Sequence, residues 1–226
     1  EQGGGPEING MLDRLGIKTQ FVNGLRVTDR ATMEVVEMVL GGKVNKEIVM
    51  GLNASGGRAV GISGKDGNLI QAEPVDASGA MGFAGRVKSI NPEIIETVIE
   101  NGYIPVISPI GTDEKQETYN INADLVAAAV AVAINADKLV LLTDVPGLLR
   151  DPADPDSLIS ILKVSEVADY VADGTIAGGM LPKIKCCVES VTGGVGRTHI
   201  IDGRLAHSIL LEIFTDQGIG TMVVNE

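Results

Sequence analysis

The segment KLVLLTDVPG, residues 138–147, carries the clearest structural signal in the chain. Its first six residues are almost all apolar, which is typical of a strand buried on both faces of a parallel sheet. The Pro- and Asp-rich stretch 146–157 follows it as a polar loop. A second apolar run at 103–109 predicts another buried strand.

Outward from these two runs, helical and strand patterns alternate, separated by Gly and Pro. The alternation predicts an α/β fold, a three-layer α/β/α sandwich with a mainly parallel central sheet. Further strands are expected at 58–63, 69–72, 85–90, 199–202 and 221–224, with a hairpin over 19–28 around Asn23-Gly24. Helices are expected at 6–15, 29–40, 45–52, 92–101, 122–136, 166–172, 181–191 and 205–214.

The polar run 111–120 is expected to be a loop and to mark a division of the chain. We therefore predict an N-terminal lobe over 1–118 and a C-terminal lobe over 119–226, which share one continuous sheet. A chain of 226 residues, 44% of them apolar, is long enough for two such lobes.

The composition argues against a nucleic-acid partner, a membrane span and a disulfide framework. A net charge of −12 argues against a nucleic-acid partner, because a phosphate backbone needs a cationic surface. The longest apolar run, 125–134, is far shorter than the roughly 18 residues of a membrane span. The two cysteines, Cys186 and Cys187, are adjacent, so they cannot build a disulfide framework or a metal cage and indicate a reducing compartment.

Two candidate sites for anions lie near the start of the chain. Gly3, Gly4 and Gly5 precede a helix whose N-terminus is suited to an anion, although a flexible chain start is the alternative. Arg26 follows the tight hairpin turn and is suited to clamp a carboxylate. The alternative is that Arg26 lies on a solvated hairpin face.

Three further polar segments are candidates for chemistry. Residues 120–124, Asn-Ile-Asn-Ala-Asp, lead into an apolar helix and include more polar groups than one N-cap requires. Residues 143–148 leave a buried strand at its carboxyl end, where α/β sheets bind ligands, or form an ordinary turn. Lys183 lies near a helix N-terminus, where a cation does not stabilise the helix. Its position there favours a site in which a phosphate binds between the lysine and the helix end.

Several familiar motifs are missing from the sequence. There is no phosphate-binding G-x-x-x-x-G-K-[ST], no dinucleotide-binding G-x-G-x-x-G and no nucleophile elbow. The two histidines, His199 and His207, lack metal-ligand spacing, and we predict no protein-bound metal. Glycine turns, Lys, Asp and Arg remain, and they suit phosphoryl transfer by positioning and charge neutralisation.

In this order along the chain, five segments resemble the amino acid kinase family, and within it the N-acetylglutamate kinases. They are Gly3-Gly4-Gly5-Pro6-Glu7-Ile8, Gly24-Leu25-Arg26-Val27-Thr28, Asn120-Ile121-Asn122-Ala123-Asp124, Leu142-Thr143-Asp144-Val145-Pro146-Gly147 and Gly179-Met180-Leu181-Pro182-Lys183. The resemblance implies transfer of the ATP γ-phosphoryl group to the γ-carboxylate of N-acetyl-L-glutamate, with Mg²⁺ carried by the nucleotide.

The resemblance also implies roles for individual residues. Catalytic roles fall to Lys183 at the γ-phosphoryl group, to Asp124 as the organiser of lysine side chains, and to the N–H groups of Gly4 and Gly5. Arg26 and Asn120 would clamp the α-carboxylate of the substrate, with Asn122 beside them. Residues 143–148 would bind ATP together with Lys183, namely through Thr143, Asp144, Val145, Gly147 and Leu148.

The C-terminal part resembles the arginine-inhibited branch through residues 199–204 and 210–216. His199, Glu212 and Gly218 would then belong to a feedback site for L-arginine, where Glu212 pairs with the guanidinium. From the residues alone, Glu212 is a surface carboxylate on an amphipathic helix.

The same resemblance implies a homo-oligomer, a dimer that assembles into a hexamer as a trimer of dimers. It raises the signalling protein PII as one candidate partner. We expect neither nucleic acid nor a membrane as partner, because of the net charge and the short apolar runs. The implied location is the cytoplasm, or the plastid stroma if the source is a photosynthetic eukaryote.

Two departures from the family pattern keep alternatives open. The family has a strand with a catalytic Lys and an oligomer-building helix ahead of the glycines, so we expect this chain to be part of a longer protein. Gln2 stands where the family usually has His. One alternative is another kinase of the fold, acting on aspartate or glutamate; the other is a non-catalytic domain that senses arginine or nucleotide.

Overall fold

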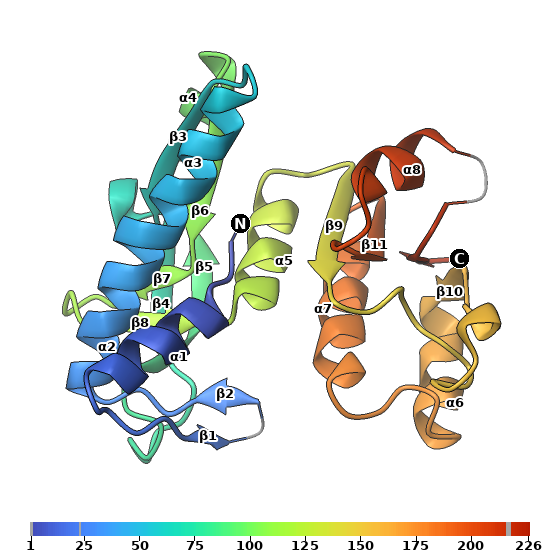
Figure 1. The fold of residues 1–226 in the computed structure, drawn as a ribbon, viewed down its shortest axis with the longest axis horizontal. Helices are drawn as coiled ribbons and strands as arrows, with labels where there is room; N and C mark the ends of the chain where they lie inside the picture. The colour runs from blue at the N-terminus through green and yellow to red at the C-terminus, as the bar shows by residue number, and fades with distance from the viewer. Residues whose placement is uncertain (1, 23, 216–217) are drawn as a thin grey trace. The chain divides into compact units, whose positions relative to one another are not determined.

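The computed structural model describes residues 2–22, 24–215 and 218–226. The chain forms two compact units, residues 1–133 and 134–226 (Figure 1). The division falls after helix α5 (Ala123–Ala133), not at the expected 118/119, because α5 packs on strand β5 (Ala84–Ile90) of the first unit. Among the described residues, no helix has the length and apolar character needed to cross a membrane.

Helix α2 (Arg30–Glu37) of the first unit begins at a capped end. The Oδ1 atom of Asp29 accepts a 2.7 Å hydrogen bond from the Thr32 N–H, as an N-cap residue does. A π-helical segment, Met38–Val44, joins α2 directly to α3 (Asn45–Ala54). The two helices expected here are therefore continuous.

Helix α1 (Gly5–Arg14) packs on α2 through a buried apolar cluster. The cluster comprises Ile8, Leu12, Met33, Val35, Val36, Val39, Leu40, Val44 and Ile110. Close packing of this kind leaves α1 little freedom to shift, so the glycines at its N-terminus are held in one place.

The strands of the first unit form a hairpin, a parallel pair and a small closed barrel. The hairpin pairs Phe21 with Arg26 as expected, with Gly24 at φ +80° and Asn23 outside the described residues. The strands are β1 (Phe21–Val22) and β2 (Leu25–Arg26) in the hairpin, β3 (Ala59–Ser63) and β6 (Ile104–Ser108) in the pair, and β4 (Ile70–Pro74), β5, β7 (Ile110–Thr112) and β8 (Thr118–Ile121) in the barrel. Helix α4 (Glu93–Glu100) precedes β6.

The barrel corrects two expectations. The polar run 111–120 is not a loop, because β7 and β8 pair there as an antiparallel hairpin. A Cβ atom on Gly85 would lie 2.5 Å from the Cβ of Tyr119, and one on Gly111 would lie 2.9 Å from Cγ2 of Ile70, so glycine permits the strands to close. Because these strands curl on themselves, the described residues do not form the single continuous sheet that was expected.

The second unit has a four-stranded sheet in the order β10-β12-β11-β9. Strand β9 (Lys138–Thr143) has the bounds that the apolar run predicted, and it pairs in parallel with β11 (Arg197–Asp202). As the outermost strand, β9 is not buried throughout: Leu139 and Leu141 are buried, whereas Leu142 is 53% exposed. The other elements are β10 (Ile161–Lys163), β12 (Thr221–Val224), α6 (Val167–Ala172), α7 (Met180–Thr192) and α8 (Ser208–Phe214). The predicted α/β class with parallel strands is confirmed.

Candidate active site

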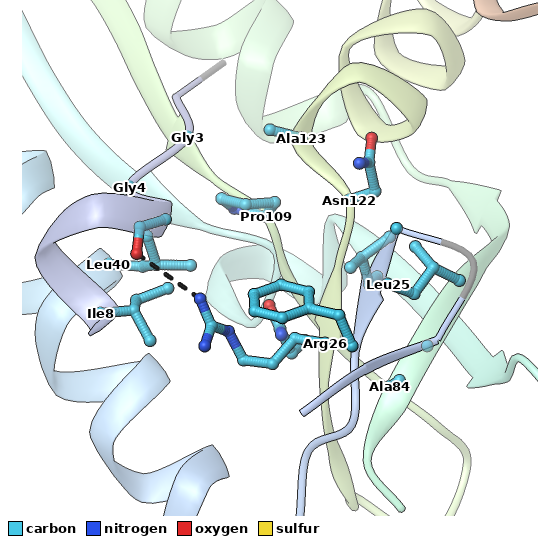
Figure 2. Close-up of a pocket in the computed structure, with 16 residues that line it drawn as sticks. Gly3, Gly4, Ile8, Leu25, Arg26, Leu40, Ala84, Pro109, Asn122 and Ala123 are labelled. Carbon is cyan, nitrogen blue, oxygen red and sulfur yellow. Dashed lines mark hydrogen bonds between the residues drawn. The ribbon is translucent and has the colours of Figure 1, made fainter. Parts of the chain in front are cut away.

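A pocket of about 210 Å³ lies in the first unit, where α1, β2, β5, β8 and the start of α5 converge (Figure 2). Five of the predicted site residues line it: Gly4, Gly5, Arg26, Asn120 and Asn122. The other lining residues are Gly3, Ile8, Phe21, Gly24, Leu25, Leu40, Ala84, Gly85, Pro109, Ile121 and Ala123. The fold thus brings together segments that are far apart in the sequence.

The N-terminus of α1 faces this pocket without a side-chain cap. Gly4 is the N-cap residue, and a Cβ atom on it would lie 2.7 Å from Cδ2 of Leu40. Glycine therefore lets the backbone lie against Leu40, while the space beside Gly5 is open. Uncapped N–H groups at the positive end of a helix dipole suit a phosphoryl group or another anion.

Arg26 is buried, with 7% of its surface exposed, so it does not lie on a solvated hairpin face. Its guanidinium stacks 4.7 Å from the Phe21 ring, and Nη2 donates a 3.5 Å hydrogen bond to the Gly5 carbonyl. Figure 2 shows the side chain reaching across the pocket toward Gly4 and Leu40. Nη1 is buried without a hydrogen-bond partner among the described residues, and burial lowers the pKa of Arg26 below its usual value. A carboxylate in the pocket would supply the missing acceptor.

Asn120 is connected to Arg26 through a residue that sequence reasoning did not single out. The Asn120 Nδ2 atom donates a 3.3 Å hydrogen bond to Oγ1 of Thr28. The Thr28 hydroxyl in turn donates a 2.9 Å hydrogen bond to the Arg26 carbonyl. Thr28 belongs to the Gly-Leu-Arg-Val-Thr segment, but no local pattern shows which distant strand its hydroxyl contacts.

Asn122 and Asp124 lie at the start of α5. The Asn122 Oδ1 atom accepts a 3.2 Å hydrogen bond from the Leu125 N–H, so Asn122 caps the helix while also lining the pocket. Asp124 follows in the first turn of α5 and is not among the residues that line the pocket.

The predicted nucleotide-binding residues follow the carboxyl end of β9 in the second unit. The Thr143 hydroxyl donates a 3.2 Å hydrogen bond to Asp144 Oδ1, and Val145 comes next in the chain. Gly147 (φ +148°) and the buried Leu148 pack against β12, where the Leu148 N–H donates a 2.8 Å hydrogen bond to Thr221 Oγ1. Thr143, Asp144 and Val145 are at least partly exposed, whereas Leu148 is buried in the core, so its predicted contact with a nucleotide is not supported.

Asp202 and Arg204 lie at the same sheet edge, because Asp202 is the register partner of Thr143. The carboxylate of Asp202 accepts hydrogen bonds from Nε (2.9 Å) and Nη2 (2.7 Å) of Arg204. The side chain and the backbone N–H of Arg204 lower the pKa of Asp202 to about 2. The sequence did not predict that Asp202 and Arg204 lie beside Thr143, because local patterns do not show that β9 and β11 are neighbours in the sheet.

Lys183 lies in the first turn of α7, as expected, and α7 packs on β11 and β12. Lys183 therefore belongs to the second unit, and Asp124, its predicted organiser, to the first. No group of three His, Cys, Asp or Glu side chains that could hold a metal ion occurs in the described part of the chain.

His199, Glu212 and Gly218 converge on a separate pocket of about 480 Å³ in the second unit. Glu212 is buried on α8, so it is not a surface carboxylate: Oε1 lies 2.7 Å from Nδ1 of His199, and Oε2 accepts a 2.6 Å hydrogen bond from the Ile219 N–H. Burial alone would raise the pKa of Glu212, but the N–H groups of Ile219 and Gly220 and the His199 side chain hold it below its usual value. Nε2 of His199 is buried without a hydrogen-bond partner among the described residues.

Comparisons with known proteins show the family of the chain. The model of the amino acid kinase family matches residues 2–202. The acetylglutamate kinases of Syntrophomonas wolfei and Heliobacterium modesticaldum are 77% and 61% identical to the chain, over 99% and 98% of it and over 78% and 79% of their own lengths. The structure of N-acetylglutamate synthase from Neisseria gonorrhoeae, complexed with coenzyme A and N-acetyl-glutamate, is 27% identical with a TM-score of 0.86, over 99% of this chain and 51% of that one. This chain belongs to the amino acid kinase family.

Proposed function

We propose that this chain transfers the γ-phosphoryl group of ATP to the γ-carboxylate of N-acetyl-L-glutamate, the second step of arginine biosynthesis. The observation that carries the proposal is the buried Arg26 guanidinium, whose Nη1 has no hydrogen-bond partner among the described residues and which shares a pocket with the uncapped N-terminus of α1. The name shared by the similar relatives, acetylglutamate kinase, supports the same acceptor.

The reaction needs positioning rather than a protein nucleophile. A γ-carboxylate oxygen of the substrate bonds to the γ-phosphorus, the bond to the bridging oxygen breaks, and ADP leaves with that electron pair. Arg26 and Asn120 hold the α-carboxylate, with Asn122 at the edge of the same pocket. The backbone N–H groups of Gly4 and Gly5 donate hydrogen bonds to the phosphoryl oxygens. These bonds orient the two reactants for in-line attack.

In this proposal, residues of the second unit bind the nucleotide. The segment 143–148 binds ATP at the carboxyl edge of β9 and β11 through its accessible residues Thr143, Asp144 and Val145, and not through the buried Leu148. Lys183 neutralises charge that develops on the γ-phosphoryl group. Asp124 organises the catalytic lysines from the first turn of α5. Oxygen ligands suit Mg²⁺, and we assign most of them to the ATP phosphates, since such sites usually hold the ion through one or two carboxylates plus substrate phosphates.

We also infer that the pocket around His199, Glu212 and Gly218 binds L-arginine as a feedback inhibitor. Oε1 of the buried Glu212 carboxylate, which pairs with His199, has a further lone pair for a guanidinium N–H, and Nε2 of His199 offers a further polar contact. In Glu212→Ala we expect the arginine concentration for half inhibition to rise by more than tenfold.

Other partners and the location extend the same proposal. We propose a homo-oligomer, a dimer or a hexamer built as a trimer of dimers, which light scattering of the full-length protein with and without arginine would test. Binding of PII would be tested in the same way with the purified signalling protein. The adjacent cysteines fit a reducing compartment, and we propose the cytoplasm.

Acyl phosphate formation by the full-length protein tests the proposed function. Hydroxylamine traps the product, with ATP and with N-acetylglutamate, glutamate or aspartate as acceptor. We expect turnover with N-acetylglutamate alone. Turnover with aspartate or glutamate would replace the substrate but keep the kinase, and no turnover with any acceptor would favour a domain that senses arginine or nucleotide.

A further inference from the structure

Thr28 connects the two groups that we assign to the substrate carboxylate. It is fully buried, and its hydroxyl donates to the Arg26 carbonyl at 2.9 Å. A carbonyl oxygen only accepts, so the hydroxyl proton is used in that bond. The 3.3 Å contact with Asn120 must then have Thr28 Oγ1 as acceptor and the amide nitrogen as donor. This sets the orientation of the Asn120 amide, which would otherwise be free to turn over.

The backbone of Thr28 is itself held in place from the barrel side. Its N–H donates a 3.2 Å hydrogen bond to the Met81 carbonyl, and its carbonyl accepts a 2.6 Å bond from the Phe83 N–H. The Phe83 carbonyl accepts a 2.9 Å bond from the Asn120 N–H. Residues 26–28, 81–83 and 120 therefore form one hydrogen-bonded unit around the Thr28 hydroxyl.

A carboxylate has only acceptor atoms, so its site must present donors. With one N–H of Asn120 given to Thr28, the second N–H remains for a ligand, alongside Nη1 of Arg26. Resting on the function proposed above, we propose that Thr28 is a positioning residue for carboxylate binding. It holds the Arg26 backbone and the Asn120 amide in the arrangement that presents both donors to the substrate.

The test is steady-state kinetics of Thr28→Val in the full-length protein. Valine keeps the shape and removes the hydroxyl, and we expect the KM for N-acetylglutamate to rise about fivefold to tenfold, the effect of one lost hydrogen bond. The kcat and the KM for ATP should change less than twofold, and Thr28→Ser should restore the KM. An unchanged KM, a matching change in all three constants, or failure of serine to restore it would overturn the role. If Thr28→Val does not fold, Thr28→Ala serves as the hydroxyl-free variant, judged by the same outcomes.

Thr198→Val is the matched control. Thr198 is also a fully buried threonine, but its hydroxyl has no hydrogen-bond partner among the described residues. The same change there should leave the KM for N-acetylglutamate within twofold of the wild type. An equal rise in this control would mean that any buried threonine matters, and would overturn the assignment to Thr28.

A double mutant shows whether Thr28 acts through Asn120. In an Asn120→Ala background, the effect of Thr28→Val on the KM should be smaller than in the wild type, because only the route through Arg26 remains, whereas independent contributions would multiply. Multiplying effects would overturn the proposed route through the amide. The turnover of the wild type is measured first, and its absence would count against the proposed function. Normal wild-type turnover together with an unchanged KM in Thr28→Val would count against the role of Thr28 alone.

Discussion

Arg26 carries a buried charge, and its Nη1 has no hydrogen-bond partner in the part of the chain that the structure describes, which is costly unless a ligand completes the site. Arg26 and Glu212 are both buried carriers of charge, and each lines a pocket. They differ in their hydrogen bonds: both oxygens of Glu212 have partners inside the protein, whereas Nη1 of Arg26 has none among the described residues.

Arg26→Met tests this difference directly. Methionine is similar in length and apolar, so the KM for N-acetylglutamate should rise by about 30-fold or more, the effect of a lost charge-assisted hydrogen bond, with a smaller change in kcat. The melting temperature should stay the same or rise, because an uncompensated buried charge is removed. Kinetics and thermal unfolding provide both values.

Arg30→Met is the control for that change. Arg30 also stacks on an aromatic ring, 4.3 Å from the centre of Phe83, but its side chain is exposed and pairs with Glu117. Its substitution should leave the KM for N-acetylglutamate within twofold. A large fall in melting temperature in Arg26→Met with an unchanged KM would show that Arg26 is structural.

Lys183 is expected to act in the transition state rather than in substrate binding. Lys183→Ala should lower kcat by about 100-fold or more and change both KM values less, because its charge acts mainly as the phosphoryl group transfers. Lys185→Ala, two residues on and exposed beside Glu189, is the control and should keep kcat within twofold. A rise in the KM for ATP without a loss of kcat would reassign Lys183 to ground-state binding.

At the scale of elements, the hairpin depends on the segment that follows β4. Thr28 forms an isolated bridge with Gly82, which has φ +60°. A Cβ atom on Gly82 would lie 2.2 Å from the Thr28 carbonyl oxygen, so the two backbones could not remain in contact. Glycine at this position therefore sets where β2 and its arginine lie.

Gly82→Ala should destabilise the protein by about 1–3 kcal/mol, because it adds left-handed strain and displaces the backbone it contacts. It should also raise the KM for N-acetylglutamate, since the displaced backbone carries Arg26. Gly79→Ala is the control: its φ is +77°, but nothing lies within 4 Å of the added Cβ atom. Equal effects on the KM in both variants would show that strain alone, and not the contact with Thr28, is responsible.

At the scale of the whole molecule, stability should depend on pH through carboxylates with lowered pKa values. Asp202 has a pKa of about 2 in the folded chain, against about 3.9 when unfolded. Because the folded value is the lower one, its contribution to stability is complete above about pH 4. The contribution is lost as the pH falls toward 2, and the lowered pKa of Glu212 acts in the same direction.

Asp202→Asn should therefore lower the melting temperature at pH 7, with a difference from the wild type that shrinks between pH 4 and pH 2. Thermal unfolding of both proteins across pH 2–7 measures it. Asp137→Asn, a carboxylate outside this pair, is the control. A difference that stays constant across this range would mean that Asp202 contributes through its shape and not through its charge.

Local patterns were enough for several elements of this chain. The apolar run at 138–143 predicted β9 at its observed bounds, Asn23-Gly24 predicted the hairpin, and Asp29 predicted the start of α2. These features depend on neighbours within a few residues, such as a cap, a turn or a periodic apolar face. The motif segments likewise led to the family and to five residues that line one pocket.

Other features depend on contacts between distant residues, which no local pattern contains. The barrel includes the polar run 111–120 and closes because Gly85 and Gly111 leave room for Tyr119 and Ile70. Glu212 is held in its buried position by a hydrogen bond from the backbone N–H of Ile219, seven residues later. Thr28 and Asn120 are 92 positions apart, and their hydrogen bond exists because both bind the backbone of residues 81–83. The amino-acid order alone thus specified most of the helices, several strands, the family and the candidate residues, but not β7, β8 or β10. Their burial, and the hydrogen bonds that orient them, came from the packing of distant strands, because desolvation and side-chain geometry arise only where those strands meet.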